Sequence, residues 1–304
     1  VCTYVTNTGK LEQVSSRGKV PSKYLRSAKC TTLKEDVVLA KPEEIDLEGA
    51  VRRVSMGSPL GSINMRWPKK IERLFGRTPE RALADAARAV SRSLRSGSFP
   101  GIVKNMSPRW EVVFLDADLP EEQIPAYLIG ACHPGWMTPP ANIYIVGQRV
   151  AGGCAGGSAS TKVADAQLAE VLIHEMGHAV EFELLRGNYS MDLVRAEGFA
   201  TWFTQYAATY SSEIDVKSLK QRYLDMAQEA LRRESNVGHF SGSSLDYARA
   251  SMIFSAIVDR RGITGLMKVY NIMAAQRLPF FEAIQSGIGW NQRRLQEEVL
   301  RLVR

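Results

Sequence analysis

The sequence contains no long apolar run, and this absence limits what the chain can be. No stretch approaches the eighteen or more apolar residues of a membrane-spanning helix, so we predict no transmembrane span. There is also no internal repeat, no low-complexity segment and no nucleic-acid-binding motif. The net charge of +7 comes from lysines and arginines scattered along the chain, as in a solvated surface with a basic bias. We therefore expect no nucleic-acid partner.

Cysteine is scarce, with four residues in a chain of 304, and the four fall into two sequence-local pairs. We predict the disulfides Cys2–Cys30 and Cys132–Cys154, although four cysteines allow three connectivities. Disulfides form in oxidising compartments, so the two predicted disulfides indicate an exported protein, periplasmic or secreted. The alternative is four free, buried thiols in a cytosolic protein. The chain has no initiator methionine and no signal-like apolar segment, so we expect Val1 to be a processed or trimmed start.

Histidine is equally scarce, yet two of the four histidines lie four residues apart around a glutamate, in His174-Glu175-Met176-Gly177-His178. The surrounding run, residues 168–182, repeats apolar residues at helical spacing, and Gly187 stands where a helix would stop. On a helix, positions i and i+4 lie on one face, so both imidazoles can reach a single metal ion. Glu175 can then address a metal-bound water. This is the HExxH arrangement of zinc peptidases.

A third metal ligand is predicted from the next helical run, residues 192–203, for which Ser190 is the expected N-cap. If the two helices form an antiparallel hairpin, its turn is centred near Asn188. His178 and Glu197 then both lie about 14 to 15 Å from the turn, at the same level. Three protein ligands with one open position characterise a catalytic zinc site, so we predict one Zn²⁺ per chain. The alternative is two ordinary buried histidines and a surface carboxylate.

Here the chain resembles a known family. His174-Glu175-Met176-Gly177-His178, eighteen further residues and then Glu197-Gly198-Phe199-Ala200 resemble the gluzincin branch of zincin metallopeptidases. The likeness is to the catalytic half of the aminopeptidase/leukotriene-hydrolase group and to the "peptidase MA-like" domains. It implies His174, His178 and Glu197 as zinc ligands and Glu175 as catalytic base. It also implies an α+β, zincin-like fold, in which a small mixed-sheet lobe is followed by an all-helical lobe.

The same resemblance suggests a catalytic tyrosine. Gluzincins of this type place a tyrosine at a helix start, fifty or more residues after the glutamate ligand, and Tyr247 occupies such a position. Its hydroxyl would donate a hydrogen bond to the oxyanion of the tetrahedral intermediate. Thr201, one helical turn beyond Glu197, could hold a ligand side chain in position without itself binding the metal. Three other residues compete with Tyr247 for the oxyanion role, namely Tyr206, Tyr210 and His239.

The chain is expected to contain three parts. Residues 1–40 form a small module in which strands at 3–6 and 11–14 flank a hairpin turn. This module resembles a short hairpin segment at the mature N-terminus of envelope proteins of Gram-negative bacteria. Residues 41–77 are expected to be a connector packed on the body, with a loop-like centre at 57–62. Residues 78–304 form the metallopeptidase-like domain.

Within this last domain we expect a helix from residue 78 to residue 94, and strands at 110–115 and 141–146. The second strand is expected to edge the substrate cleft. Beyond residue 212 the patterns are all helical, with helices predicted at 216–233, 245–261, 264–275 and 291–304.

The resemblance implies hydrolysis of peptide bonds in a peptide or protein substrate, cell-wall peptide included. Residues 123–164 contain no Asp or Glu, so the expected cleft offers no carboxylate to a substrate's free amine unless an acidic residue of the helical lobe, such as Asp192 or Asp246, approaches it. We therefore expect an endopeptidase of the cell envelope or exterior. Two alternatives remain at this point. One is a catalytically inactive gluzincin-fold binding or scaffold protein, and the other is a zinc hydrolase acting on peptidoglycan cross-links.

Overall fold

The computed structural model describes residues 2–5, 11–14, 29–30, 41–96, 99, 109–116, 119, 123–124, 133–153, 160–188 and 192–304, the first three of these ranges by their backbone alone. The chain divides into two compact units. The first comprises Val1–Ala40 and Leu119–Ala131, and the second comprises Lys41–Asp118 and Cys132–Arg304.

The first unit contains a three-stranded antiparallel sheet of β1 (Cys2–Val5), β2 (Leu11–Val14) and β3 (Lys29–Cys30), in the order β2-β1-β3. The register places Cys2 directly opposite Cys30. Directly opposed residues of an antiparallel pair have Cα atoms about 4.5 or 5.5 Å apart. A disulfide spans both separations. The cysteine side chains themselves, like Cys132, Cys154 and the hairpin turn, lie outside the described part of the chain, so both disulfides stay predictions.

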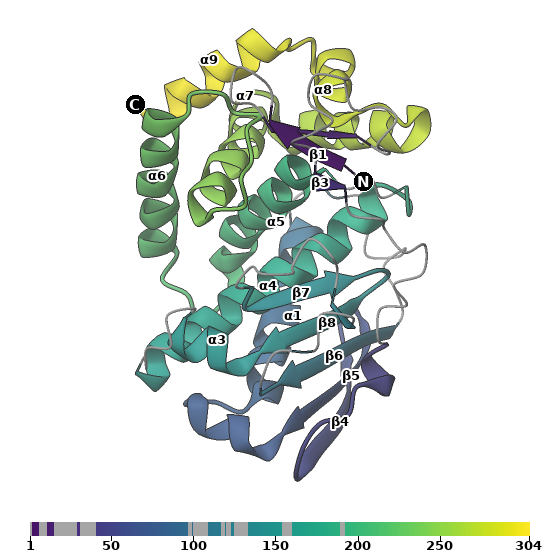
Figure 1. The fold of residues 1–304 in the computed structure, drawn as a ribbon. Helices are drawn as coiled ribbons and strands as arrows, with labels where there is room; N and C mark the ends of the chain where they lie inside the picture. Colours follow the sequence, from purple (N-terminus) through teal and green to yellow (C-terminus); the bar gives the residue numbers. More distant parts are fainter. Residues whose placement is uncertain are drawn as a thin grey trace. The chain divides into compact units, whose positions relative to one another are not determined.

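The second unit is an α+β structure built on a five-stranded mixed sheet with the order β4-β5-β6-β8-β7 (Figure 1). β5 runs parallel to β6 and β6 parallel to β8, whereas β4 and β7 are antiparallel to their neighbours. The small mixed sheet and the helices that follow it agree with the predicted α+β class. The strands are β4 (Val51–Ser58), β5 (Gly61–Pro68), β6 (Arg109–Leu115), β7 (Gly135–Thr138) and β8 (Asn142–Val146).

Residues 41–77 differ from the expected connector because they supply two strands of this sheet. β4 and β5 pair over eight residues each, and the expected loop at 57–62 reduces to a tight turn at Pro59 and Leu60. In β5 the side chains of Ile63, Met65 and Trp67 are buried and alternate with more exposed neighbours. This period of two is the pattern of a half-buried strand.

The expected position of the edge strand was also wrong. β8, predicted at 141–146, lies between β6 and β7, and β7 forms the edge of the sheet in the described part of the chain. β7 has only four residues, Gly-Trp-Met-Thr, too few to show an alternating pattern. It is held in register with β8, and the Trp136 and Tyr144 rings stack with their centroids 5.0 Å apart.

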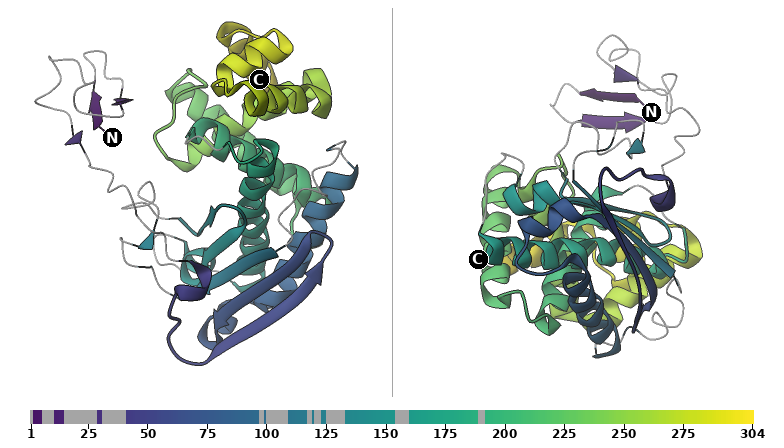
Figure 2. Two further views of the ribbon diagram at one scale, coloured as in Figure 1. Left: turned by 90° about the vertical axis from the view of Figure 1, so that its right-hand side faces the viewer. Right: turned by 90° about the horizontal axis from the view of Figure 1, so that it is seen from below.

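Helices α1 and α4 pack against each other and against the sheet, while α5 to α9 form the helical part of the unit (Figures 1 and 2). Each predicted helix is present, with ends that differ by up to seven residues. α8 and the short α3 were not predicted. The helices are α1 (Pro79–Ser96), α3 (Gly147–Gly152), α4 (Thr161–Leu184), α5 (Leu193–Ala207), α6 (Val216–Arg233), α7 (Ser244–Gln276), α8 (Phe280–Ile288) and α9 (Gln292–Val303), with short 3₁₀ turns at Pro42–Glu44, Lys69–Leu74 and Ala208–Tyr210.

The two helices predicted at 245–261 and 264–275 form the two halves of α7. The backbone leaves the helical conformation at Gly262, where φ is 66°, and becomes helical again after it. The predicted boundary is therefore confirmed as a break within one long element. Its first half carries Tyr247 in its first turn.

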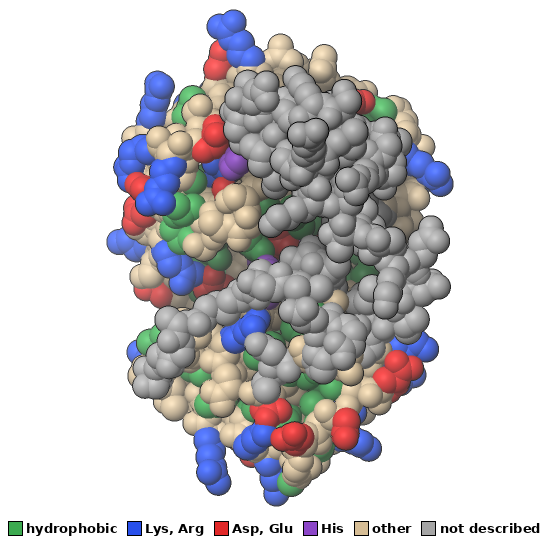
Figure 3. Space-filling view, in the orientation of Figure 1, with side chains coloured by type: hydrophobic (Ala, Val, Ile, Leu, Met, Phe, Trp, Pro, Cys, Tyr) green, Lys and Arg blue, Asp and Glu red, His purple; other side chains and the backbone are tan. Residues whose placement is uncertain are grey.

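None of the helices in the described ranges is both long and apolar enough to cross a membrane. On the face shown in Figure 3, lysine and arginine side chains of the described residues are interspersed with acidic ones. The distribution agrees with the scattered basic residues of the sequence.

Candidate metal centre

Helix α4 carries the HExxH residues through the interior of the second unit. It begins after Ser160, whose hydroxyl accepts a hydrogen bond from the Val163 amide. It packs against α1, α3, α5 and the strands β7 and β8, so most of its sides are buried. The helix ends at Leu184, and Gly187 follows with φ at 74°, in the left-handed region that glycine favours. The predicted helix end is confirmed.

Helix α5 returns alongside α4. Its N-cap is Asp192, whose carboxylate accepts a hydrogen bond from the Arg195 amide at 3.2 Å. The expected cap, Ser190, lies outside the described residues. The two helices approach closely because Gly177 faces Ala200: a Cβ atom at position 177 would lie 3.3 Å from the Ala200 Cα atom. This places His178 and Glu197 at the same level, as the hairpin argument predicted.

The three predicted ligands form one cluster. Oε2 of Glu197 lies 3.2 Å from Nε2 of His174 and 3.4 Å from Nε2 of His178. The two imidazole rings are nearly perpendicular, with centroids 4.9 Å apart. Two ligand atoms on a tetrahedral ion with bonds of about 2.0 to 2.1 Å are separated by about 3.3 Å. The His174, His178 and Glu197 side chains could therefore hold a metal ion.

The electrostatics of the cluster favour a charged carboxylate. Burial alone would raise the pKa of Glu197, but the two neighbouring imidazoles hold it well below its ordinary value. Burial lowers the pKa of His178, and the charge and hydrogen bond of Glu197 more than offset this, so the pKa is raised overall. One carboxylate oxygen shared between two imidazole nitrogens is an arrangement that a bound cation would stabilise further.

Glu175 lies beside this cluster and does not belong to it. Its side chain is 4% exposed, and its Oε2 atom has no hydrogen-bond partner among the described residues. Burial raises the pKa of Glu175 to about 8, partly offset by His174. A divalent cation in the cluster would favour the ionised form of this carboxylate.

Unpartnered buried polar atoms gather around the cluster. Six such side-chain atoms occur among the described residues, and four of them lie close to the ligands in the sequence of α4 and α5. Native proteins leave few buried polar atoms without a partner, so such a concentration points to a functional site. Thr201, fully buried one turn after Glu197, contributes one of these atoms. The four are Glu175 Oε2, His178 Nδ1, Glu181 Oε2 and Thr201 Oγ1.

Of the four candidates for the oxyanion role, the structure places Tyr247 beside a ligand. Its ring lies 6.2 Å from the His174 ring, centroid to centroid, at an angle of 29°. Tyr210 bonds the Ser96 hydroxyl at the end of α1, and Tyr206 packs on Phe99. The fourth candidate, His239, is exposed.

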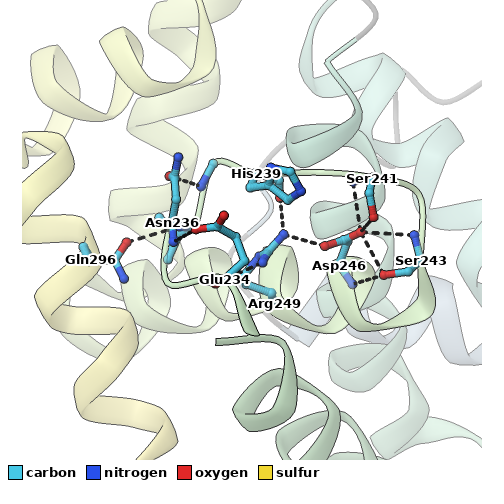
Figure 4. Close-up of polar contacts among 10 residues, drawn as sticks. Glu234, Asn236, His239, Ser241, Ser243, Asp246, Arg249 and Gln296 are labelled. Carbon is cyan, nitrogen blue, oxygen red and sulfur yellow. Dashed lines mark hydrogen bonds and ion pairs between the residues drawn. The ribbon is translucent and has the colours of Figure 1, made fainter. Parts of the chain in front are cut away.

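A polar network holds the start of α7 in place (Figure 4). Tyr247 lies in the first turn of this helix. Asp246 accepts hydrogen bonds from the backbone and side chain of both Ser241 and Ser243, at 2.6 to 3.1 Å. Arg249 bonds the same carboxylate and two backbone carbonyls, those of Glu234 and His239. The loop before α7 is thus tied to the helix on both sides of Tyr247.

The sequence reasoning missed His133. This half-buried residue lies two positions before β7, the strand that packs on α4: a Cβ atom at Gly135 would lie 3.0 Å from Cγ1 of Val171. Burial lowers the pKa of His133, and Glu197, His174 and His178 all influence it, which places it near the cluster. No local pattern marks His133, because its relation to α4 arises from strand pairing.

No family model matches the chain, and no curated protein matches it. The resemblance to gluzincins therefore rests on the motif residues themselves.

The cluster predicts that the purified protein binds one divalent metal ion per chain. Metal analysis should give a near-stoichiometric ion, and chelation should lower the melting temperature because the ion stabilises only the folded state. His174→Ala should abolish stoichiometric binding. His239→Ala is the matched control, since it removes an exposed imidazole. A His174→Ala protein that binds the ion as tightly as the wild type would contradict this assignment.

Proposed function

We propose that this chain is a zinc-dependent peptidase of the gluzincin type, with a zincin-like fold in its second unit. The observation that carries the proposal is the Glu175 carboxylate, buried with an unpartnered oxygen next to a cluster of two histidines and a glutamate. A structural metal site does not require a buried carboxylate with an unpartnered oxygen beside its ligands, whereas a hydrolytic site needs a carboxylate as a base.

The donor set supports zinc as the ion. Two imidazoles and one carboxylate form the ligand set of many catalytic zinc sites, and three protein ligands leave a coordination position open. When bound, zinc supplies an acidified water molecule and polarises the carbonyl group of the substrate. His174, His178 and Glu197 would hold it.

The proton transfers of hydrolysis fall to Glu175 in this proposal. The carboxylate accepts a proton as water attacks the peptide carbonyl, and it later donates that proton to the leaving amine as the C–N bond breaks. The products are one carboxylic acid and one amine, so atoms and protons balance. Burial raises the pKa of Glu175, and a cation in the cluster would lower it again, so the two effects oppose each other in a group that must serve as both base and acid.

Tyr247 is the proposed oxyanion donor. Its ring lies beside His174, and the Asp246–Arg249 network anchors the helix start that carries it. Catalytic donors stabilise the transition state best when they are held in place beforehand. Thr201 would steady the Glu197 side of the cluster, one helical turn away.

The proposed substrate is an extended peptide chain without a free amine at the cleavage site. β7, the edge strand of the sheet within the described residues, packs on α4 just before His174, where a substrate strand could pair with it by backbone hydrogen bonds. Asp192 and Asp246, two carboxylates of the helical part that could have received an ammonium group, have other partners. Asp192 caps α5, and Asp246 is bonded by two serines and Arg249. We therefore propose endopeptidase cleavage, in an exported protein of the cell envelope or exterior.

Glu175→Gln should leave folding and zinc binding intact and remove hydrolysis, because the amide cannot accept the proton. Turnover of a mixed peptide library by the two proteins tests this, with zinc content measured in parallel. Glu183→Gln, the same change in a half-buried carboxylate of the same helix, should retain activity. If the wild type binds zinc yet cleaves neither peptides nor peptidoglycan, the hypothesis of a catalytically inactive scaffold protein is favoured.

Tyr247→Phe should reduce kcat by roughly 10² to 10³, the loss expected for one oxyanion donor, with little change in zinc affinity. Tyr206→Phe and Tyr210→Phe serve as controls, because their contacts lie at the end of α1 and near Phe99. If Tyr247→Phe keeps its turnover and one of the control variants loses roughly 10² to 10³ of kcat instead, the oxyanion role belongs to the tyrosine changed in that control.

Matched peptides that differ only in a free or acetylated N-terminus should be cleaved at similar rates, or faster when acetylated. A free ammonium group near the cluster would lose hydration without an ionic partner, at a cost of several kcal/mol. The comparison requires kcat/KM for both peptides. A strong preference for the free amine would identify an aminopeptidase and refute the endopeptidase assignment.

A further inference from the structure

A second group of buried charges lies one helical turn beyond His178. Glu181 on α4, Arg195 on α5 and Tyr270 on α7 each have 0% exposure. Oε1 of Glu181 accepts a hydrogen bond from Nε of Arg195 at 3.0 Å and another from the Tyr270 hydroxyl at 2.6 Å. The group therefore joins three helices at one carboxylate oxygen.

A buried group of this kind is an unfavourable way to stabilise the fold if its only role is to hold helices together. Removing a carboxylate and a guanidinium from water is unfavourable, and apolar residues of similar volume often stabilise the fold equally well. Both partners of Glu181 converge on the same oxygen, Oε1, and the other oxygen, Oε2, has no partner among the described residues. A carboxylate held by one oxygen has the second one available for another donor.

The donor that fits is Nδ1 of His178. Glu181 follows His178 by three residues, so the two side chains lie on the same face of α4. His178 Nδ1 is likewise buried and without a partner. The charge of Glu181 raises the pKa of His178, and Arg195 lowers it, so both charges act on this imidazole. When Nε2 of a histidine binds a metal, Nδ1 carries the proton and requires an acceptor.

We propose that Glu181 is the positioning residue of the metal centre: its Oε2 atom accepts the Nδ1–H of His178, directly or through one bridging water, when Nε2 binds the ion. Arg195 and Tyr270 hold the carboxylate in place through Oε1. The inference rests on the proposed function only in that it requires a metal ion on His178. It assigns Glu181 no contact with substrate.

The test is zinc affinity, measured by competition with a chelating dye, in the wild type and in Glu181→Gln. Loss of an acceptor behind a metal-bound histidine typically weakens metal binding 10- to 100-fold, and we expect a loss of about that size. Glu298→Gln is the matched control. Glu298 is also buried, at 3% exposure, and paired with arginines, but it lies on α9 and contacts α7 through Arg260. Its substitution should lower the melting temperature without changing zinc affinity.

A spectroscopic readout separates positioning from general destabilisation. In the zinc-loaded wild type, the Nδ1 proton of His178 should give a low-field NMR resonance that exchanges slowly with solvent. Glu181→Gln should shift this resonance or broaden it by exchange, and Glu298→Gln should leave it unchanged. If Glu181→Gln does not fold, Tyr270→Phe removes only one anchoring hydroxyl, and it should weaken zinc binding by a smaller factor.

The outcomes distinguish this inference from the proposed function. Wild-type protein that binds no zinc would refute both. Wild-type protein that binds zinc, with unchanged affinity and an unchanged His178 resonance in Glu181→Gln, would overturn the positioning role alone. If the Glu181→Gln protein does not fold, unchanged zinc affinity in Tyr270→Phe would overturn the positioning role of Glu181 instead.

Discussion

The geometry of the candidate metal centre depends on the close approach of three helices, α4, α5 and α7. α4 meets α5 where Gly177 faces Ala200, and α5 meets α7 where a Cβ atom at Gly198 would lie 2.9 Å from the Ala250 carbonyl oxygen. Each glycine is the immediate neighbour of a candidate ligand, His178 or Glu197. A larger residue would separate the helices, since overpacking costs about 1 to 3 kcal/mol and is relieved by backbone shifts. The same contacts therefore set the helix spacing and the distances between ligands.

Helices packed this closely leave little room for water beside the polar groups of the centre. Hydrogen-bond and ion-pair partners for these groups must therefore come from neighbouring helices. Glu197 on α5 is paired with imidazoles on α4, and Glu181 on α4 is paired with Arg195 on α5 and Tyr270 on α7. Each carboxylate would be costly to bury alone. The ligand cluster and the group behind it thus depend on the packing of the helices, and they restrict that packing in return. Tyr247 shares this dependence, because its helix start is tied down by Asp246 and Arg249.

The sequence predicted the helices of the fold better than its sheet. The helix predicted at 216–233 is α6 with the same bounds, and the break predicted after residue 261 occurs at Gly262. Helical periodicity repeats over many residues and is visible in a single segment. The sheet was harder to predict, because β7 has only four residues and β4, although its exposure alternates from Arg53 to Ser58, contains no buried residue. Whether such short segments become strands is decided by the partner they pair with.

At the candidate site, the sequence by itself determined the set of possible ligands. His174 and His178 share a helix face by local geometry, and the predicted hairpin brought Glu197 level with them. Only the tertiary structure decided which distant residues surround this set. It put Tyr247 beside His174 and Tyr206 and Tyr210 elsewhere, it brought His133 near the cluster through the pairing of β7, and it placed Arg195 and Tyr270 on Glu181. The reason is physical: helical spacing fixes neighbours within a turn or two, whereas neighbours far apart in the chain depend on how the whole unit packs.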